Sequence, residues 1–176
     1  MNRRDSLQRM TLLLGGVLSP QITAGLMGQV INEGSSVVVS DAQKTLLIEL
    51  ADTIIPTTGT PGAKAAGVEQ FIMRLMRDCY LKKEQETFYS GLDTLEADCI
   101  TSHGKGFAAL DAEARNQMVR ETIKTNRAFF NEMRQLTVTG YFTSEIGATQ
   151  ALEYLPIPGV FHGDVPMESG QKTWAL

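Results

Sequence analysis

The chain has 176 residues, of which 43% are hydrophobic and 20% are charged, and its formal net charge is −4. This length fits one domain that can bury its own core, and this composition excludes a largely disordered chain and a protein with several membrane spans. The acidic balance makes the protein a poor binder of nucleic acid or anionic lipid.

Residues 1–31 have the layout of an export signal. A basic start with Arg3 and Arg4 is followed by an apolar run from Thr11 to Ile31. A charged segment followed by a moderately apolar one is typical of a secretory signal, and the paired arginines indicate the twin-arginine type. This type of signal exports proteins that have already folded, so it predicts a folded protein in the periplasm.

The match to the twin-arginine pattern, Ser/Thr-Arg-Arg-x-Phe-Leu-Lys, is incomplete. Leu7 fits the pattern, whereas Ser6 and Gln8 depart from it. An uncleaved membrane anchor and a general secretory signal are the alternatives. An anchor is disfavoured because a spanning helix needs about 20 apolar positions, and glycine, proline, serine and glutamine interrupt this run.

Residues 32–39 are predicted to be a linker, and residues 40–155 a helical domain. Ser40 and Gln43 form a capping box, after which apolar residues recur at helical spacing up to Ile55, and Pro56 ends this first helix. The next segment is a loop by its proline and glycine content. A second helix is predicted over residues 68–79, where apolar residues recur every three or four positions.

Further helices are predicted in the second half of the domain. After a polar break at residues 81–84, a third helix runs from Phe88 through residue 99 and ends at Gly104. A fourth begins at the Asp111 cap and either continues to Gly140, which ends it, or bends near residues 125–126. Ser144 caps one more short helix, over residues 145–152.

Prolines and glycines in residues 156–176 predict an extended C-terminal arm. The sequence therefore predicts an all-α protein, a small bundle of about four to five helices with an irregular arm. The arm and the segment before it carry the aromatic candidates for partner binding: Tyr141, Phe142, Tyr154 and Phe161. An apolar arm has to pack on something, either on its own bundle or on another protein, and Tyr141 and Phe142 have the core as an alternative location.

The two cysteines, Cys79 and Cys99, fall on apolar faces of neighbouring predicted helices. An antiparallel helix pair would bring them together, and an oxidising compartment permits a disulfide. The alternative is two buried free thiols that fill space in the core.

No catalytic or metal-binding pattern is recognisable in the sequence. Residues 104–109, GKGFAA, fit a dinucleotide fingerprint, but that motif requires a preceding buried strand, and the preceding pattern is helical. His103 and His162 have no third ligand nearby for a metal. We therefore predict no catalytic, cofactor-binding or metal-binding residues in this chain.

Three stretches resemble a known protein family. They are LIELADTIIPTTGTPGAKAAGVEQFI at residues 47–72, GKGFAALDAEARNQ at residues 104–117, and GYFTSEIGATQALEYLPIPG at residues 140–159. Together with the leader, they resemble subunit 3, the small or gamma subunit, of membrane-bound sugar dehydrogenases of the gluconate 2-dehydrogenase type. The resemblance runs from about residue 41 to residue 166; Asp164 departs from it, because some relatives carry a cysteine in this region.

The resemblance implies an accessory subunit of an oxidoreductase complex, without an active site or cofactor of its own. In such complexes a large FAD-containing flavoprotein of the glucose-methanol-choline type oxidises the sugar, and a c-type cytochrome subunit with haem c takes the electrons. The small subunit carries the export signal that the flavoprotein lacks, escorts it through the twin-arginine translocase and stays bound to it. The implied location is the periplasm, at the membrane through the complex.

Two other functions remain as alternatives. The chain could be a subunit that takes part directly in electron transfer, which would require a bound cofactor. It could also be a free-standing periplasmic helical binding protein, which would be a soluble monomer without a large partner.

Overall fold

The computed structural model describes residues 37–155, 157, 159, 160, 164, 166 and 169–174. Its folded unit begins at Val37. In chain order the elements are α3 (Asp41–Ile54), α4 (Val68–Cys79), α5 (Lys82–His103), the 3-10 helix η1 (Phe107–Ala109), α6 (Ala112–Thr125), α7 (Arg127–Phe142) and the π-helical turn η2 (Gly147–Ala151). The described residues contain no strand, and the prediction of a small all-α bundle is confirmed.

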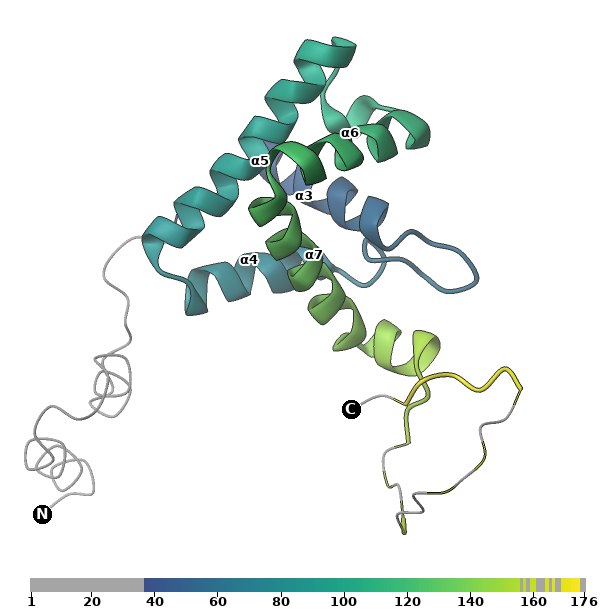
Figure 1. The fold of residues 1–176 in the computed structure, drawn as a ribbon. Helices are drawn as coiled ribbons and strands as arrows, with labels where there is room; N and C mark the ends of the chain where they lie inside the picture. Colours follow the sequence, from purple (N-terminus) through teal and green to yellow (C-terminus); the bar gives the residue numbers. More distant parts are fainter. Residues whose placement is uncertain are drawn as a thin grey trace, which may run out of the picture. The chain divides into compact units, whose positions relative to one another are not determined.

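The bundle is organised around α3, which contacts α4, α5, α6 and α7 (Figure 1). Helix α7 packs on α4, α3 and α6 and then leads into η2 and the C-terminal segment. The core between these helices consists of side chains at helical spacing, among them Leu47, Leu50, Ile72, Leu92 and Met133. Each helix therefore contributes one apolar stripe, as the sequence pattern predicts.

Several predicted helix ends are confirmed by their capping contacts. Ser40 Oγ accepts the Gln43 N–H at 3.2 Å, and Gln43 Oε1 accepts the Ser40 N–H at 3.1 Å. Asp111 Oδ1 accepts the Ala114 N–H at 2.8 Å at the start of α6, and Gly104 ends α5 with a left-handed φ of 67°. Short polar side chains and glycine thus set these boundaries locally.

Other boundaries differ from the prediction. Helix α5 begins at Lys82, inside the predicted polar break, because the Glu84 carboxylate accepts the Leu81 N–H at 2.9 Å and caps the helix. Of the two alternatives for the fourth predicted helix, the bend near residues 125–126 is confirmed: the helix is divided at Asn126, whose side chain accepts the Phe129 N–H and starts α7. The polar residues 81–84 thus start α5 instead of separating two helices.

Gly140 does not end α7, which continues to Phe142. Gly140 lies in the interface between α7 and α4, and a Cβ there would come within 2.7 Å of Phe71 Cδ1. The glycine therefore permits a close helix–helix approach instead of a helix stop, so this part of the prediction was wrong.

The first described residues are held against the bundle. The Val37 N–H donates to Gln85 Oε1 at 3.1 Å, and the buried Gln85 amide donates to the Tyr80 carbonyl at 2.9 Å. Val37 and Val39 are partly buried against the core. The chain therefore enters the folded unit along α5, near the corner between α4 and α5.

Candidate functional site

Two of the sequence stretches singled out above are joined by ion pairs around Glu49. Its carboxylate accepts from Lys64 Nζ at 2.6 Å and from Arg115 Nη1 at 2.6 Å. Arg115 also donates to the carbonyls of Phe107 and Ala108, at 3.2 and 2.6 Å. One acidic side chain of α3 thus connects the loop after α3 with α6 and η1.

The electrostatics of this ion-paired joint (Glu49, Lys64 and Arg115) favour the charged form of the acid. Hydrogen bonding to Lys64, followed by that to Arg115, holds the pKa of Glu49 below its usual value, although partial burial opposes this shift. The Arg115 guanidinium also lies 5.7 Å from the centroid of the Phe107 ring, within cation–π range. Because these charged groups pair with one another, the joint connects α3, the loop after it, α6 and η1.

Tyr141 connects the third stretch to the first. Its hydroxyl donates to the Pro61 carbonyl at 2.6 Å, and the residue is only 2% exposed. Of the two locations that the sequence left open, the structure places Tyr141 in the core. The buried Tyr141 ring also supports the neighbouring Phe142 ring, because the two rings pack edge-to-face with their centroids 5.2 Å apart.

An apolar groove lies at the C-terminal end of α7, and we call it the α7–η2 groove. Its volume is about 780 Å³, and it is bounded by α7, η2 and the C-terminal segment. The apolar lining residues are Val138, Phe142, Ala148, Leu152, Tyr154 and Trp174. The other described lining residues are five serines or threonines and one charged residue, Glu145.

Local hydrogen bonds build this groove. Ser144 Oγ donates to the Tyr141 carbonyl at 2.6 Å and accepts the Gly147 N–H at 3.0 Å, which turns the chain from α7 into η2. The Glu153 N–H then donates to the Thr173 carbonyl at 2.8 Å, in an isolated parallel bridge between Glu153 and Trp174. This pairing returns the end of the chain to η2 and places the Trp174 ring at the groove.

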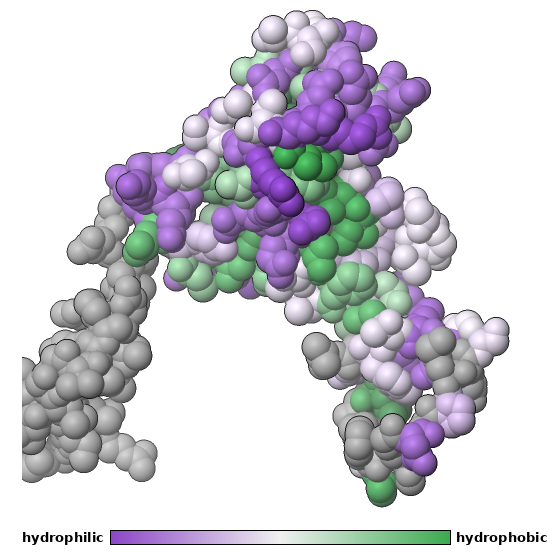
Figure 2. All heavy atoms as spheres, in the orientation of Figure 1, coloured by the Kyte–Doolittle hydropathy of each residue, from purple (hydrophilic) through white to green (hydrophobic). Residues whose placement is uncertain are grey.

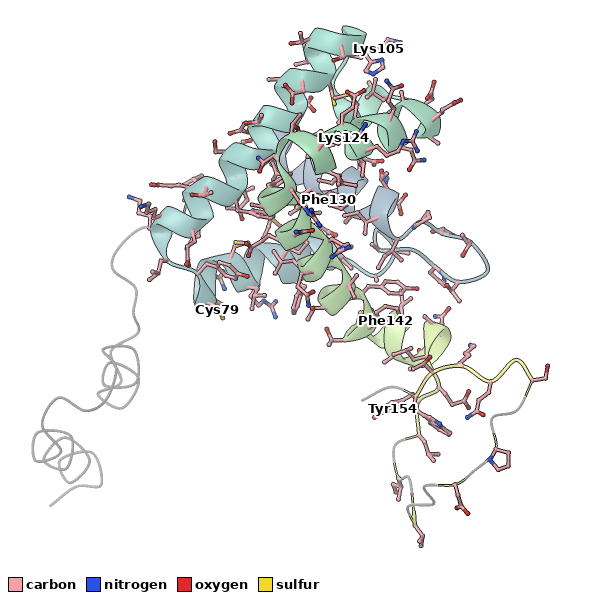
Figure 3. The ribbon with its side chains drawn as sticks, in the orientation of Figure 1. Cys79, Lys105, Lys124, Phe130, Phe142 and Tyr154 are labelled. Carbon is pink, nitrogen blue, oxygen red and sulfur yellow. The ribbon has the colours of Figure 1, made fainter. Side chains whose placement is uncertain are left out.

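Large apolar side chains of the groove are accessible to solvent. Phe142 is 39% exposed, Tyr154 54% and Trp174 51%. Figure 3 shows Phe142 at the end of α7 and Tyr154 on the segment that follows η2. In Figure 2, apolar residues are visible toward the end of α7, whereas the surface over α5 and α6 is mostly hydrophilic. Exposed apolar residues gathered in this way are typical of interaction surfaces.

The predicted partner-binding residues therefore separate into three groups. Phe142 and Tyr154 line the groove together, whereas Tyr141 is buried beneath it. Phe161 lies outside the described residues, as do the export-signal residues Arg3, Arg4 and Leu7. Binding by Phe142 and Tyr154 stays a prediction that their exposure permits.

Trp174 and Val138 are groove residues that the sequence analysis missed. Trp174 is the only tryptophan of the chain, and its place within the predicted C-terminal arm was the available signal. Val138 lines the groove from the surface of α7, and its position off the apolar stripe that faces the core was the available signal. The backbone hydrogen bond between residues 153 and 173 joins segments that are 20 residues apart, so no local sequence pattern predicts it.

The expected disulfide is not formed: Cys79 and Cys99 are free. Cys79 is exposed at the end of α4, beside the corner, whereas Cys99 is buried 17 residues into α5, about 26 Å along the helix at 1.5 Å per residue. Bridging needs Cα atoms closer than about 7 Å. The prediction was wrong because a shared apolar face does not place two residues at the same height along neighbouring helices: Cys79 is the last residue of α4, whereas Cys99 lies near the far end of α5.

The described part of the chain contains neither a cluster of metal ligands nor a membrane-spanning helix. No three histidine, cysteine, aspartate or glutamate side chains converge there in a way that could hold a metal ion. None of the helices described combines the length and the apolar character needed to cross a bilayer.

Comparison with known proteins gives one match. Residues 41–159, more than half of the chain, match the family model described as gluconate 2-dehydrogenase subunit 3. No curated protein and no solved structure matches the chain. The match includes the ion-paired joint, Tyr141 and most of the α7–η2 groove.

Proposed function

Because the chain belongs to the gluconate 2-dehydrogenase subunit 3 family, we propose that it is a non-catalytic small subunit that escorts a folded flavoprotein into the periplasm and stays bound to it. The family is a subunit of a dehydrogenase complex, so the protein has other subunits as partners. Family membership is the observation that supports this proposal most strongly.

The α7–η2 groove supports a docking role. A subunit that stays bound needs a surface that gains stability when a partner covers it, and apolar side chains provide this gain. Phe142, Tyr154 and Trp174 are aromatic and at least one-third exposed, and aromatic residues are enriched at protein interfaces. We propose this groove as the docking surface for the large flavoprotein subunit.

The export role is proposed for residues 1–31. Arg3 and Arg4 fit a twin-arginine signal, and a flavoprotein that has bound FAD in the cytoplasm must cross the membrane folded. A small subunit that binds the flavoprotein before export could carry it along with a single signal. This explains why one short chain would need both a leader and a docking surface.

The proposed assembly divides the chemistry among its subunits. The flavoprotein, of the glucose-methanol-choline type, holds FAD and oxidises the sugar, and a c-type cytochrome subunit holds haem c and accepts the electrons. The present chain holds no cofactor in this proposal. The complex is attached to the membrane on the periplasmic side.

The proposal is tested by following the flavoprotein in cells that express the complex. With the wild-type chain we expect the flavoprotein in the periplasm, in a complex that can be purified through a tag on the small subunit. With Arg3→Lys and Arg4→Lys together, we expect both chains in the cytoplasm, whereas Arg9→Lys outside the pair is the matched control. Periplasmic flavoprotein in the double variant would contradict the escort role.

A further inference from the structure

The α7–η2 groove contains one acidic side chain among apolar and hydroxyl-bearing ones. Glu145 is exposed, and among the described residues it is the only charged one of the lining. Within the described part of the chain, its carboxylate takes part in no ion pair and accepts no hydrogen bond. The nearby Lys172 donates to the Gln150 carbonyl at 2.6 Å instead.

This unpaired carboxylate restricts what can cover the groove. In the free protein, water solvates Glu145, but a docked partner that removed this water without supplying a cation would leave a buried charge unpaired. Burying an unpaired charged group is strongly unfavourable. A stable occupant must therefore bring apolar side chains for the walls and a positive charge for Glu145.

Other occupants fit these requirements less well. A second copy that docked groove to groove around a two-fold axis would place one Glu145 near another, because such an interface joins the same patch of both chains. An anionic lipid surface would be repelled by the same carboxylate and by the acidic chain.

We propose that the α7–η2 groove binds a surface segment of the flavoprotein that carries apolar side chains next to a lysine or arginine, and that this cation pairs with Glu145. The inference rests on the function proposed above and names the chemistry of the partner at that surface. Phe142, Tyr154 and Trp174 supply the apolar contact. Glu145 determines register and specificity, because a segment without the cation would leave it unpaired.

A charge series at position 145 tests the pairing in the full complex. We expect Glu145→Gln to weaken flavoprotein binding about tenfold and Glu145→Lys about a hundredfold or more, since truncating one partner of a desolvated pair and reversing its charge have effects of this order. Glu86→Lys is the matched control, because Glu86 is also an exposed helical glutamate but lies on α5, away from the groove.

Binding is measured on purified full-length proteins at two salt concentrations. We expect wild-type affinity to fall with salt more steeply than that of Glu145→Gln, because only the wild type has the ion pair to screen. Both variants should keep the wild-type circular dichroism spectrum and unfolding midpoint, since Glu145 is exposed. Unchanged affinity in Glu145→Lys would overturn the inference.

Photo-crosslinking identifies the occupant directly. Thr149 lines the groove and is exposed, so a photoreactive phenylalanine analogue is placed there in the assembled complex. We expect it to crosslink to a flavoprotein peptide that contains apolar residues and a lysine or arginine. Changing that cation to glutamate should restore binding to Glu145→Lys.

The outcomes separate this inference from the proposed function. If the complex forms but the crosslink joins Thr149 to the leader, to a second copy or to lipid, the inference is wrong and the escort role stands. If the wild-type chain binds no flavoprotein at all, the escort role is wrong and the inference falls with it. A flavoprotein crosslink without any nearby cation would also overturn the pairing.

Discussion

The ion-paired joint and most of the α7–η2 groove lie within residues 41–159, which match the family. The two regions differ in whether their charged groups are paired and their apolar groups are buried. In the joint, Glu49 and Arg115 are mostly buried and each has more than one partner. In the groove, Glu145 lacks a partner within the described chain and aromatic rings face solvent. The first region stabilises the monomer, whereas the second is suited to a partner.

The largest expected difference is between two phenylalanines, one from each region. Phe107→Ala removes a fully buried ring that also faces Arg115, and we expect it to lower the free energy of unfolding by about 3–5 kcal/mol. Phe142→Ala at the groove should lower it by less than about 1 kcal/mol but should weaken flavoprotein binding. Urea unfolding followed by circular dichroism measures the first effect, and pull-down the second. Equal destabilisation would mean that Phe142 belongs to the core.

Removing the arginine of the joint should have an intermediate effect. Arg115→Ala removes the bonds to Glu49 and to two carbonyls, and we expect a loss of about 1–3 kcal/mol in the free energy of unfolding. Arg77→Ala is the control, because Arg77 pairs with the adjacent Asp78 in an exposed position, where ion pairs contribute little. If both variants unfolded at the same urea concentration, the joint would not be a stabilising feature.

The joint should also make stability depend on pH. Lys64 and then Arg115 hold the pKa of Glu49 below its usual value in the folded state. The resulting stabilisation is therefore fully present above the unfolded pKa of about 4.3 and is lost as the pH falls through the lower folded-state pKa.

The test for this dependence is unfolding of wild type and Glu49→Gln at a series of pH values. We expect the wild type to be the more stable protein at neutral pH, and the difference to shrink as the pH is lowered below about 4. A difference that stayed constant down to pH 3 would show that the charge of Glu49 is not what stabilises the joint.

The smallest effect on stability is expected for the cysteines, whose reactivity with a thiol reagent reports which of them is at the surface and which is in the core. Cys79 is exposed, whereas Cys99 is buried, and burial raises the pKa of its thiol to about 11. In the native protein, a thiol reagent should therefore modify Cys79 rapidly, whereas Cys99 should react only after unfolding. Cys79→Ser should remove the rapid phase and leave the unfolding midpoint unchanged. If the denatured protein showed no free thiols, the cysteines would be bonded after all.

The sequence alone determined the parts of the fold that depend on local chemistry. Hydrogen bonds between residues three apart set the starts of α3 and α6, so Ser40 and Asp111 could be identified as caps. The apolar stripes of α3 and α4 likewise follow from spacing alone. For the candidate site, the sequence identified Phe142 and Tyr154 because aromatic residues stood next to glycines and prolines.

Tertiary structure decided what depends on residues far apart in the chain. The bond from Tyr141 to Pro61 makes one ring core and leaves its neighbour Phe142 at the surface. The pairing of Glu153 with Thr173 brings Trp174 to the groove, and the long α5 keeps Cys99 away from Cys79. Sequence spacing fixes which side chains share a helix face, but the distance between two faces depends on how the helices pack.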